Sequence, residues 1–254
     1  MLKRSENYWC SQIQGEREYQ EDDVGFDDSY PDQLVILLAD GMGGYAGGDI
    51  ASQAVLEVFS QTFRSDNEVI HSKRLDNSLI SANNELTSIV ANNPKLQGMG
   101  CTFVGTVLSY KKSDLHWVSV GDSPLWIFRN GVLKRLNEDH SKRKELDSRV
   151  EKGELTILEA RENPTRNALT SALTGEPPSL IDNNCVSIES EDIILLASDG
   201  IFSLSNKEIE QQISNSNTAE EITSKLIEAV ISKKVENQDN TSILIVKIPP
   251  NFKQ

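Results

Sequence analysis

The segment Leu34–Val55, LVILLADGMGGYAGGDIASQAV, decides the fold because it joins a buried strand to an amphipathic helix. Its first six residues are apolar, and a run of this length is typical of a strand with both faces covered. The run ends at Asp40, and five glycines follow within eight positions, from Gly41 to Gly48. A carboxylate at the end of a buried strand, followed by glycines that have no side chains, indicates a place where a ligand can approach the main chain.

Helical patterns appear on both sides of the chain's centre. The first helix is expected from Asp49, with Asp49 as its N-cap and apolar residues on one face as far as residue 63. Residues 75–89 carry a second stripe of the same spacing. Two later helices are expected after Ser205-x-x-Glu208 and Thr218-x-x-Glu221, which match the capping-box pattern.

Strand-like apolar runs alternate with these helices. They are Leu34–Ala39, Cys101–Leu108, Leu115–Val120, Leu125–Phe128, Ile193–Ala197 and Ser242–Ile248. Asn130-Gly131 lies between two short apolar runs, and this dipeptide favours a tight hairpin because both residues tolerate positive φ. The sheet structure is therefore expected to be at least partly antiparallel, with helices packed outside it.

Size and charge restrict the possible functions. The 254 residues suit one large domain or two small ones, and the net charge of −14 argues against nucleic acid or an anionic membrane as main partner. No apolar run approaches the roughly 20 residues that span a bilayer, and no secretory signal is seen, so a cytoplasmic location is expected. Cys10, Cys101 and Cys185 show no paired spacing and are expected to be reduced and buried.

Acidic residues recur beside the predicted strands. They are Asp40 in LLADGMGG, Asp122 in VSVGDS, Asp199 in LLASDG, Asp239 in QDNTS, and Glu21, Asp22 and Asp23 in EREYQEDDV. Any one of them could be a helix cap or part of an Asx turn. Gathered at the strand ends of one sheet, however, such carboxylates would repel one another unless a cation lay among them.

The chemistry of these ligands favours hard ions. All are oxygen donors without a histidine pair or cysteine cluster, which favours Mg²⁺ or Mn²⁺. Two such ions could share a carboxylate and activate a bridging water against a phosphate ester. On this interpretation Asp40 is a ligand, the Gly41 carbonyl approaches a cation, and Gly43 and Gly44 keep the mouth of the site open. A flexible turn would explain the glycines equally well.

Seven short motifs then occur in a specific order. They are GEREYQEDD, ADGMGG, GCTFVGTVL, VSVGDS, NPTRNALTSALTG, LLASDG and QDNTS. Together they resemble the metal-dependent protein phosphatases of type 2C, the PPM family, from about Ser11 to Ile248. The resemblance implies an α+β fold, a four-layer αββα sandwich of two antiparallel β-sheets flanked by helix pairs. It implies a single phosphatase domain over residues 1–254, with a flap insertion over roughly residues 138–170.

The resemblance also implies an activity and its cofactors. Members hydrolyse phosphoserine and phosphothreonine in proteins with a water that bridges two divalent ions, Mg²⁺ or Mn²⁺. A phosphorylated protein, the product of an opposing serine/threonine kinase, is therefore the expected substrate, and a monomer is expected. By position, Asp40 bridges both ions, and Asp199 and Asp239 complete the shell of one.

The resemblance also implies roles for the other residues that match the family's metal-binding and phosphate-binding positions. The Gly41 carbonyl would serve the other ion, with Glu21 and Asp22 acting directly or through waters. Asp122 matches the ligand of a third, weaker metal. Arg17 matches the catalytic arginine that grips the substrate phosphate, a task suited to the forked donors of guanidinium.

Three positions depart from the family pattern. Met42 stands where many eukaryotic members have a histidine that protonates the leaving group, and methionine here is typical of bacterial members. Pro124 and Ser171 stand where arginine is usual. The family features that these two changes affect are the third metal site and the docking of the flap. His140, at the base of the flap, is expected to be structural.

Two rival functions stay open. One is a degenerate member that binds phosphoproteins without turnover, although the presence of Asp22, Asp40, Asp199 and Asp239 argues against it. The other is a different two-metal phosphoesterase such as a nuclease, which the net charge of −14 disfavours.

Overall fold

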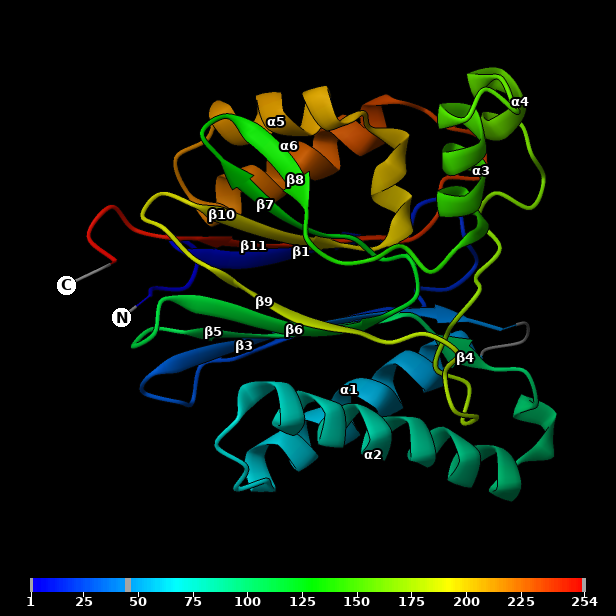
Figure 1. Cartoon of the computed structure of the whole chain (residues 1–254), viewed down its shortest axis with the longest axis horizontal. Helices are drawn as coiled ribbons and strands as arrows, with labels where there is room; N and C mark the ends of the chain where they lie inside the picture. Colours follow the sequence, from blue (N-terminus) through cyan, green and yellow to red (C-terminus); the bar gives the residue numbers. More distant parts are fainter. Residues whose placement is uncertain (1, 44–46, 253–254) are drawn as a thin grey trace.

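The computed structural model describes residues 2–43 and 47–252, and in it two β-sheets pack face to face between two layers of helices (Figure 1). Sheet A contains, in spatial order, β1 (Tyr8–Ile13), β11 (Thr241–Lys247), β10 (Ile193–Ala197), β7 (Leu125–Arg129) and β8 (Val132–Arg135). Sheet B contains β2 (Asp22–Asp27), β3 (Gln33–Met42), β5 (Phe103–Ser109), β6 (Asp114–Val120) and β9 (Asp182–Ser187), with β4 (Gly100–Cys101) paired to β3. The pairings between these strands are antiparallel.

Helix pairs cover the outer face of each sheet, so the predicted four-layer αββα sandwich is confirmed (Figure 1). Sheet B is covered by α1 (Gly48–Ser65) and α2 (His71–Asn92), and sheet A by α5 (Asn206–Ser214) and α6 (Ala219–Ser232). Short 3₁₀ helices, η1 (Pro94–Leu96) and η2 (Asp199–Ser203), follow α2 and β10.

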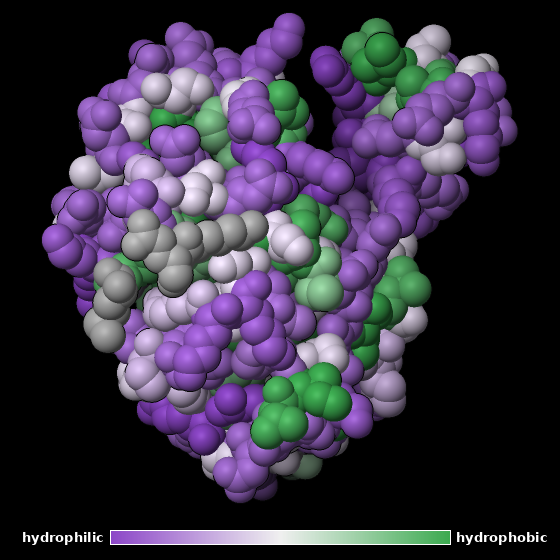
Figure 2. Space-filling model, turned by 60° about the vertical axis from the view of Figure 1, so that its left-hand side comes forward, coloured by the Kyte–Doolittle hydropathy of each residue, from purple (hydrophilic) through white to green (hydrophobic). Residues whose placement is uncertain are grey.

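The segment 138–170, which we call the flap segment, contains α3 (Lys142–Glu151) and α4 (Ile157–Arg161). It forms a lobe at one end of the sandwich, and Figure 2 shows this lobe set off from the rest by a notch. These two helices lie within the flap insertion that the resemblance implied. The side chains of Ile157 and Leu158 are each 62% exposed on it.

The central strand β3 shows how the layers are specified. Alternate residues of a strand point to opposite faces of a sheet. Those facing sheet A are Leu34, Ile36 and Leu38, and those facing α1 and α2 are Val35, Leu37 and Ala39. All six are buried, which is why the sequence shows a continuous apolar run here.

Two predicted helix caps differ from the structure. The N-cap of α1 is Gly47, so the prediction that Asp49 caps this helix is wrong; Asp49 lies in the first turn, where its charge suits the helix dipole. The capping box of Ser205 and Glu208 is confirmed. Thr218 caps α6, but the Glu221 carboxylate accepts from the Asn217 N–H, so the second box is only half formed.

The hairpin prediction is confirmed, whereas some strand boundaries are not. Asn130 and Gly131 have φ values of 53° and 81° between β7 and β8, as a two-residue turn of positive φ requires. The apolar run from Cys101 is interrupted at Thr102, between β4 and β5. Cys101 is buried, but Cys185 on β9 is exposed, so the prediction that all three cysteines are buried is wrong.

None of the helices in residues 2–43 and 47–252 is both long enough and apolar enough to cross a lipid bilayer.

Candidate active site

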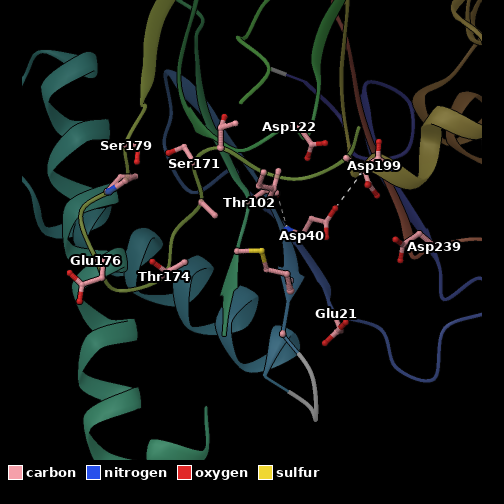
Figure 3. Close-up of a pocket in the computed structure, with 18 of the residues that line it drawn as sticks. Glu21, Asp40, Thr102, Asp122, Ser171, Thr174, Glu176, Ser179, Asp199 and Asp239 are labelled. Atoms are coloured by element: carbon pink, nitrogen blue, oxygen red, sulfur yellow. Dashed lines mark hydrogen bonds between the residues drawn. The ribbon is translucent and has the colours of Figure 1, made fainter. Parts of the chain in front are cut away.

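A cavity of about 980 Å³ lies at the end of the sandwich that faces the flap segment (Figure 3). Seven of the eight predicted site residues line it: Arg17, Glu21, Asp40, Gly41, Asp122, Asp199 and Asp239. The opposite wall is formed by the end of the flap segment and the residues that follow, between Asn167 and Ser179. Residues that are more than 200 positions apart in sequence therefore meet in one place.

Asp40 lies near the end of β3 and is oriented by its neighbours. Its backbone N–H donates to the Thr102 hydroxyl at 3.3 Å, and one carboxylate oxygen accepts from the Asp199 backbone N–H at 3.5 Å. Figure 3 shows the Asp40 side chain pointing toward Asp199, with a dashed line that marks this hydrogen bond. The two strand-end aspartates thus form the centre of the acidic group.

Asp22 is the one predicted site residue that does not line the cavity. It pairs with Asp40 across β2 and β3, but its side chain is only 7% exposed. One carboxylate oxygen accepts from the hydroxyls of Ser198, at 2.8 Å, and Ser242, at 2.6 Å. Its other oxygen has no hydrogen-bond partner among the described residues.

Burial and mutual repulsion change the acidity of this group. Burial raises the pKa of Asp40 well above its usual range, and the charges of Asp22 and Asp199 raise it further. Burial, with the neighbouring charges of Asp122 and Asp239, raises the pKa of Asp199 to about 7. Without cations, these carboxylates therefore resist carrying their full negative charge together.

The donor set fits hard divalent ions, although the side chains must rearrange to hold one. All candidate ligands are oxygens, and repulsion among them would be relieved by a cation. Among the residues that the structure describes, no three acidic, histidine or cysteine side chains are arranged to hold a single ion as they stand. The Asp239 carboxylate is instead paired with the Arg17 guanidinium at 2.6 Å.

Steric constraints explain why glycines occur beside Asp40. A Cβ on Gly41 would lie 2.3 Å from the Gly48 carbonyl oxygen and 2.5 Å from that of Glu21. Glycine is therefore needed for β3 to approach the start of α1 and the loop before β2. Gly43 has a φ of 137°, which disfavours any side chain. Gly44 lies outside the described residues.

Asn240 is a positioning residue that sequence reasoning missed. Its side chain is 4% exposed and accepts from the Glu21 N–H at 2.8 Å. It also donates to the carbonyls of Gln14, at 2.7 Å, and Tyr19, at 3.0 Å. Asn240 thus holds the loop that contains Arg17 in place. Because Asn240 follows Asp239 in sequence, it also keeps this loop close to Asp239. Its place in the QDNTS motif was the only signal available.

Two of the positions that depart from the family pattern, Met42 and Ser171, line the cavity. The Ser171 hydroxyl also donates to the Leu180 carbonyl at 2.9 Å. The His140 ring accepts from the Gly121 N–H at 3.2 Å, one residue before Asp122, in keeping with a structural role.

The chain resembles known proteins in both sequence and structure. A model of the family described as protein phosphatase 2C matches residues 14–239. The serine/threonine phosphatase stp of Listeria monocytogenes is 28% identical over 236 residues, 91% of each chain. The serine/threonine protein phosphatase PstP of Mycobacterium tuberculosis is 30% identical over 177 residues, which are 69% of this chain and 33% of PstP.

Solved structures show the same architecture. The crystal structure of Mycobacterium tuberculosis PstP/Ppp has a TM-score of 0.82 at 26% identity, covering 96% of this chain and 99% of that one. The catalytic domain of PstP in complex with two manganese ions has a TM-score of 0.79 at 25% identity, with the same coverage.

Proposed function

Because the chain belongs to the protein phosphatase 2C family and is a metal-dependent serine/threonine protein phosphatase, we propose that Asp40, Asp199 and Asp239 bind its two divalent ions. Asp40 is assigned to both ions, and Asp199 and Asp239 to one of them. The observation that carries this assignment is the convergence of these three residues on one cavity. Rotation of the Asp239 side chain away from Arg17 completes the set.

The remaining acidic residues have supporting roles in this proposal. Glu21 and the Gly41 carbonyl lie on the cavity wall next to Asp40 and serve the second ion directly or through waters. Asp22 lies behind Asp40, where its negative charge strengthens the attraction for cations without reaching the cavity.

Arg17 is proposed to bind the substrate phosphate. Its side chain is 51% exposed at the edge of the cavity, so the guanidinium can reach a phosphate group that enters from solvent. The ion pair with Asp239 must then be exchanged, and recruitment of Asp239 to a metal would release the arginine. Guanidinium offers parallel N–H donors that match two phosphate oxygens.

The chemistry that two divalent ions supply at such a site is Lewis-acid activation of water and of the phosphoryl group. The protein itself contributes the positions of the ligands and of the substrate phosphate. Asp40 is fixed by a strand that is buried on both faces, and Asn240 holds the loop of Arg17 and Glu21 against the start of β11. Arg17 orients the phosphate toward Asp40 and Asp199, which sets the line of attack.

We extend the proposal to partners and location. The substrates are phosphorylated proteins, and we propose that they are products of an opposing serine/threonine kinase. We also propose that residues 1–254 act as one phosphatase domain, as a monomer in the cytoplasm, with neither nucleic acid nor membranes as partners. The net charge of −14 and the free cysteines support these points.

A direct assay tests this function. Purified protein is incubated with a phosphothreonine peptide, p-nitrophenyl phosphate or single-stranded DNA, first with Mn²⁺ and then with excess chelator. We expect Mn²⁺-dependent release of phosphate from the first two substrates and no cleavage of DNA.

Two variants sharpen the assay. Asp199→Asn should abolish most turnover, whereas Asp32→Asn, which removes an exposed aspartate paired with Lys111, should not. A protein that is inert with every divalent ion, or Asp199→Asn with full activity, would contradict the proposal.

A further inference from the structure

Asp122, the predicted ligand of a third metal, is already paired with a cation of the chain itself. Arg143, in the first turn of α3, places a guanidinium nitrogen 3.4 Å from the Asp122 carboxylate. Both side chains are largely buried, at 11% exposure for Arg143 and 4% for Asp122. An ion pair removed from water in this way is held more tightly than a surface pair.

Further contacts hold the Arg143 guanidinium at the cavity. It donates to the Asn167 side-chain oxygen at 3.1 Å and lies 3.6 Å from the Asp139 carboxylate. Its central carbon is 4.0 Å from the centroid of the Phe202 ring, a cation–π contact. Phe202 belongs to η2, the short helix that begins at Asp199. Arg143 therefore links the flap segment to both loops that carry Asp122 and Asp199.

Asp122 and the neighbouring Asp139 each have an arginine partner without a metal ion. Arg135 donates to the Asp122 backbone carbonyl at 2.8 Å and pairs with Asp139 at 2.9 Å. Two arginines thus face two aspartates in one buried cluster. A divalent ion at Asp122 would have to break the pair with Arg143 and leave that guanidinium beside a like charge, which is unfavourable because both side chains are largely shielded from water.

We propose that Arg143 takes the place of a third divalent ion at Asp122, so that the enzyme holds two ions and its flap segment is tied to the metal centre. This inference rests on the proposed two-ion function of Asp40, Asp199 and Asp239. Arg143 is a positioning residue in this account, because it acts on the site through Asp122 and Phe202.

The number of bound Mn²⁺ ions tests the proposal. Wild-type protein is titrated with Mn²⁺ while the free ion is counted by electron paramagnetic resonance. Two bound ions are expected for the wild type and for Arg143→Lys, which keeps the charge. Arg143→Gln should bind three ions, with an affinity for the third at least about tenfold above that of any residual third binding by the wild type. Adding Asp122→Asn to Arg143→Gln should remove that third ion.

Arg149→Gln is the matched control, because it removes one charge from the same helix at an arginine that is 42% exposed and pairs with Glu154. It should bind two ions. A wild type that binds three ions as tightly as Arg143→Gln would overturn the proposal, and so would a third ion in Arg143→Gln that survives Asp122→Asn. Should Arg143→Gln fail to fold, the wild-type count still decides, because three ions refute the proposal and two support it.

Hydrolysis of p-nitrophenyl phosphate separates this inference from the proposed function. An active enzyme with three tightly bound ions would refute the role of Arg143 alone. A protein that binds no ions and releases no phosphate would refute the two-ion function as well.

Discussion

At the scale of single residues, the pairing of Arg17 with Asp239 joins two predicted roles. One residue is proposed to bind the substrate phosphate and the other a metal ion, yet in the structure they bind each other at 2.6 Å. Both are partly exposed, so the pair is weak enough to be exchanged. A metal ion bound by Asp239 would release Arg17 for the phosphate, and a phosphate bound by Arg17 would release Asp239 for the metal. The two binding events are therefore expected to strengthen each other.

The first prediction concerns Asp40. Asp40→Asn should lower kcat at saturating Mn²⁺ by more than about 100-fold, because loss of a direct ligand costs more than loss of a group that only orients one. The metal-free variant should be at least as stable as the wild type, since the substitution removes a repelling charge. Phosphopeptide kinetics and urea unfolding with chelator measure the two effects. Wild-type kcat in the purified variant would argue against the assignment.

The second prediction concerns Arg17. Arg17→Ala should raise KM for a phosphothreonine peptide by about tenfold or more with a smaller change in kcat, because the lost contact is made to bound substrate. Arg17→Lys should recover only part of the affinity, since ammonium lacks the forked donors. Arg64→Ala, which breaks an ion pair with Asp27 in which neither residue lines the cavity, is the control. An unchanged KM in Arg17→Ala would exclude the phosphate-binding role.

At the scale of elements, buried strands were the most predictable part of the fold. β3, β10 and β11 show continuous apolar runs because both of their faces are covered. By contrast, β1, β2 and β9 mix polar and apolar residues and are only partly buried, so their strand structure depends on the neighbours that they pair with. These three strands could not be predicted from the chain alone.

The wall of the cavity opposite Asp40 is positioned by α2. The buried Asn83 side chain accepts from the backbone N–H groups of Thr174, at 3.2 Å, and Gly175, at 3.0 Å, and donates to the Glu176 carbonyl at 2.9 Å. The Thr87 hydroxyl also donates to the Gly175 carbonyl at 2.7 Å. This loop is therefore part of the rigid scaffold and shapes the path to the catalytic centre.

The third prediction follows from this loop. Asn83→Ala should lower the free energy of unfolding by about 1–3 kcal/mol, because it removes three hydrogen bonds to part-buried backbone groups. It should raise KM for a phosphopeptide more than for p-nitrophenyl phosphate, which is too small to need the wall. Urea unfolding and steady-state kinetics measure both, with Asn84→Ala, on an exposed face of α2, as control. Equal KM changes for the two substrates would show that the loop does not contact peptides.

At the scale of the whole molecule, the sequence identified acidic residues near strand ends but not the residues that connect them. Asp40, Asp122, Asp199 and Asp239 were visible because acids follow or precede apolar strands. The roles of Asn240 and Arg143 depend on which distant loops meet, and no local pattern reveals that. Asp22 was expected to serve an ion directly or through waters, and the structure pairs it with Asp40 outside the cavity lining.

A second feature of the whole molecule is a histidine pair remote from the cavity. His71, at the start of α2, contacts the His116 ring on β6 with centroids 5.1 Å apart. Burial lowers the pKa of His71, and the charges of His116 and Lys112 lower it further, while Asp114 opposes them.

The lowered pKa of His71 predicts a pH dependence of stability. The folded protein binds fewer protons at His71 than the unfolded chain, so its contribution is present above the unfolded pKa of about 6.5 and is lost as pH falls below that value. His71→Gln should lose less free energy of unfolding between pH 7.5 and pH 5.5 than the wild type. Urea unfolding with chelator measures this, and identical losses in the two proteins would contradict it.

The central claim is that acids from separate strand ends gather around two divalent ions. Anomalous diffraction from a crystal soaked in Mn²⁺ tests it most directly, since it locates each ion relative to its ligands. We expect two strong peaks in the cavity, both bound by Asp40, with Asp199 and Asp239 turned to one of them and Arg17 released. An empty cavity, or peaks bound without Asp40, would contradict the account.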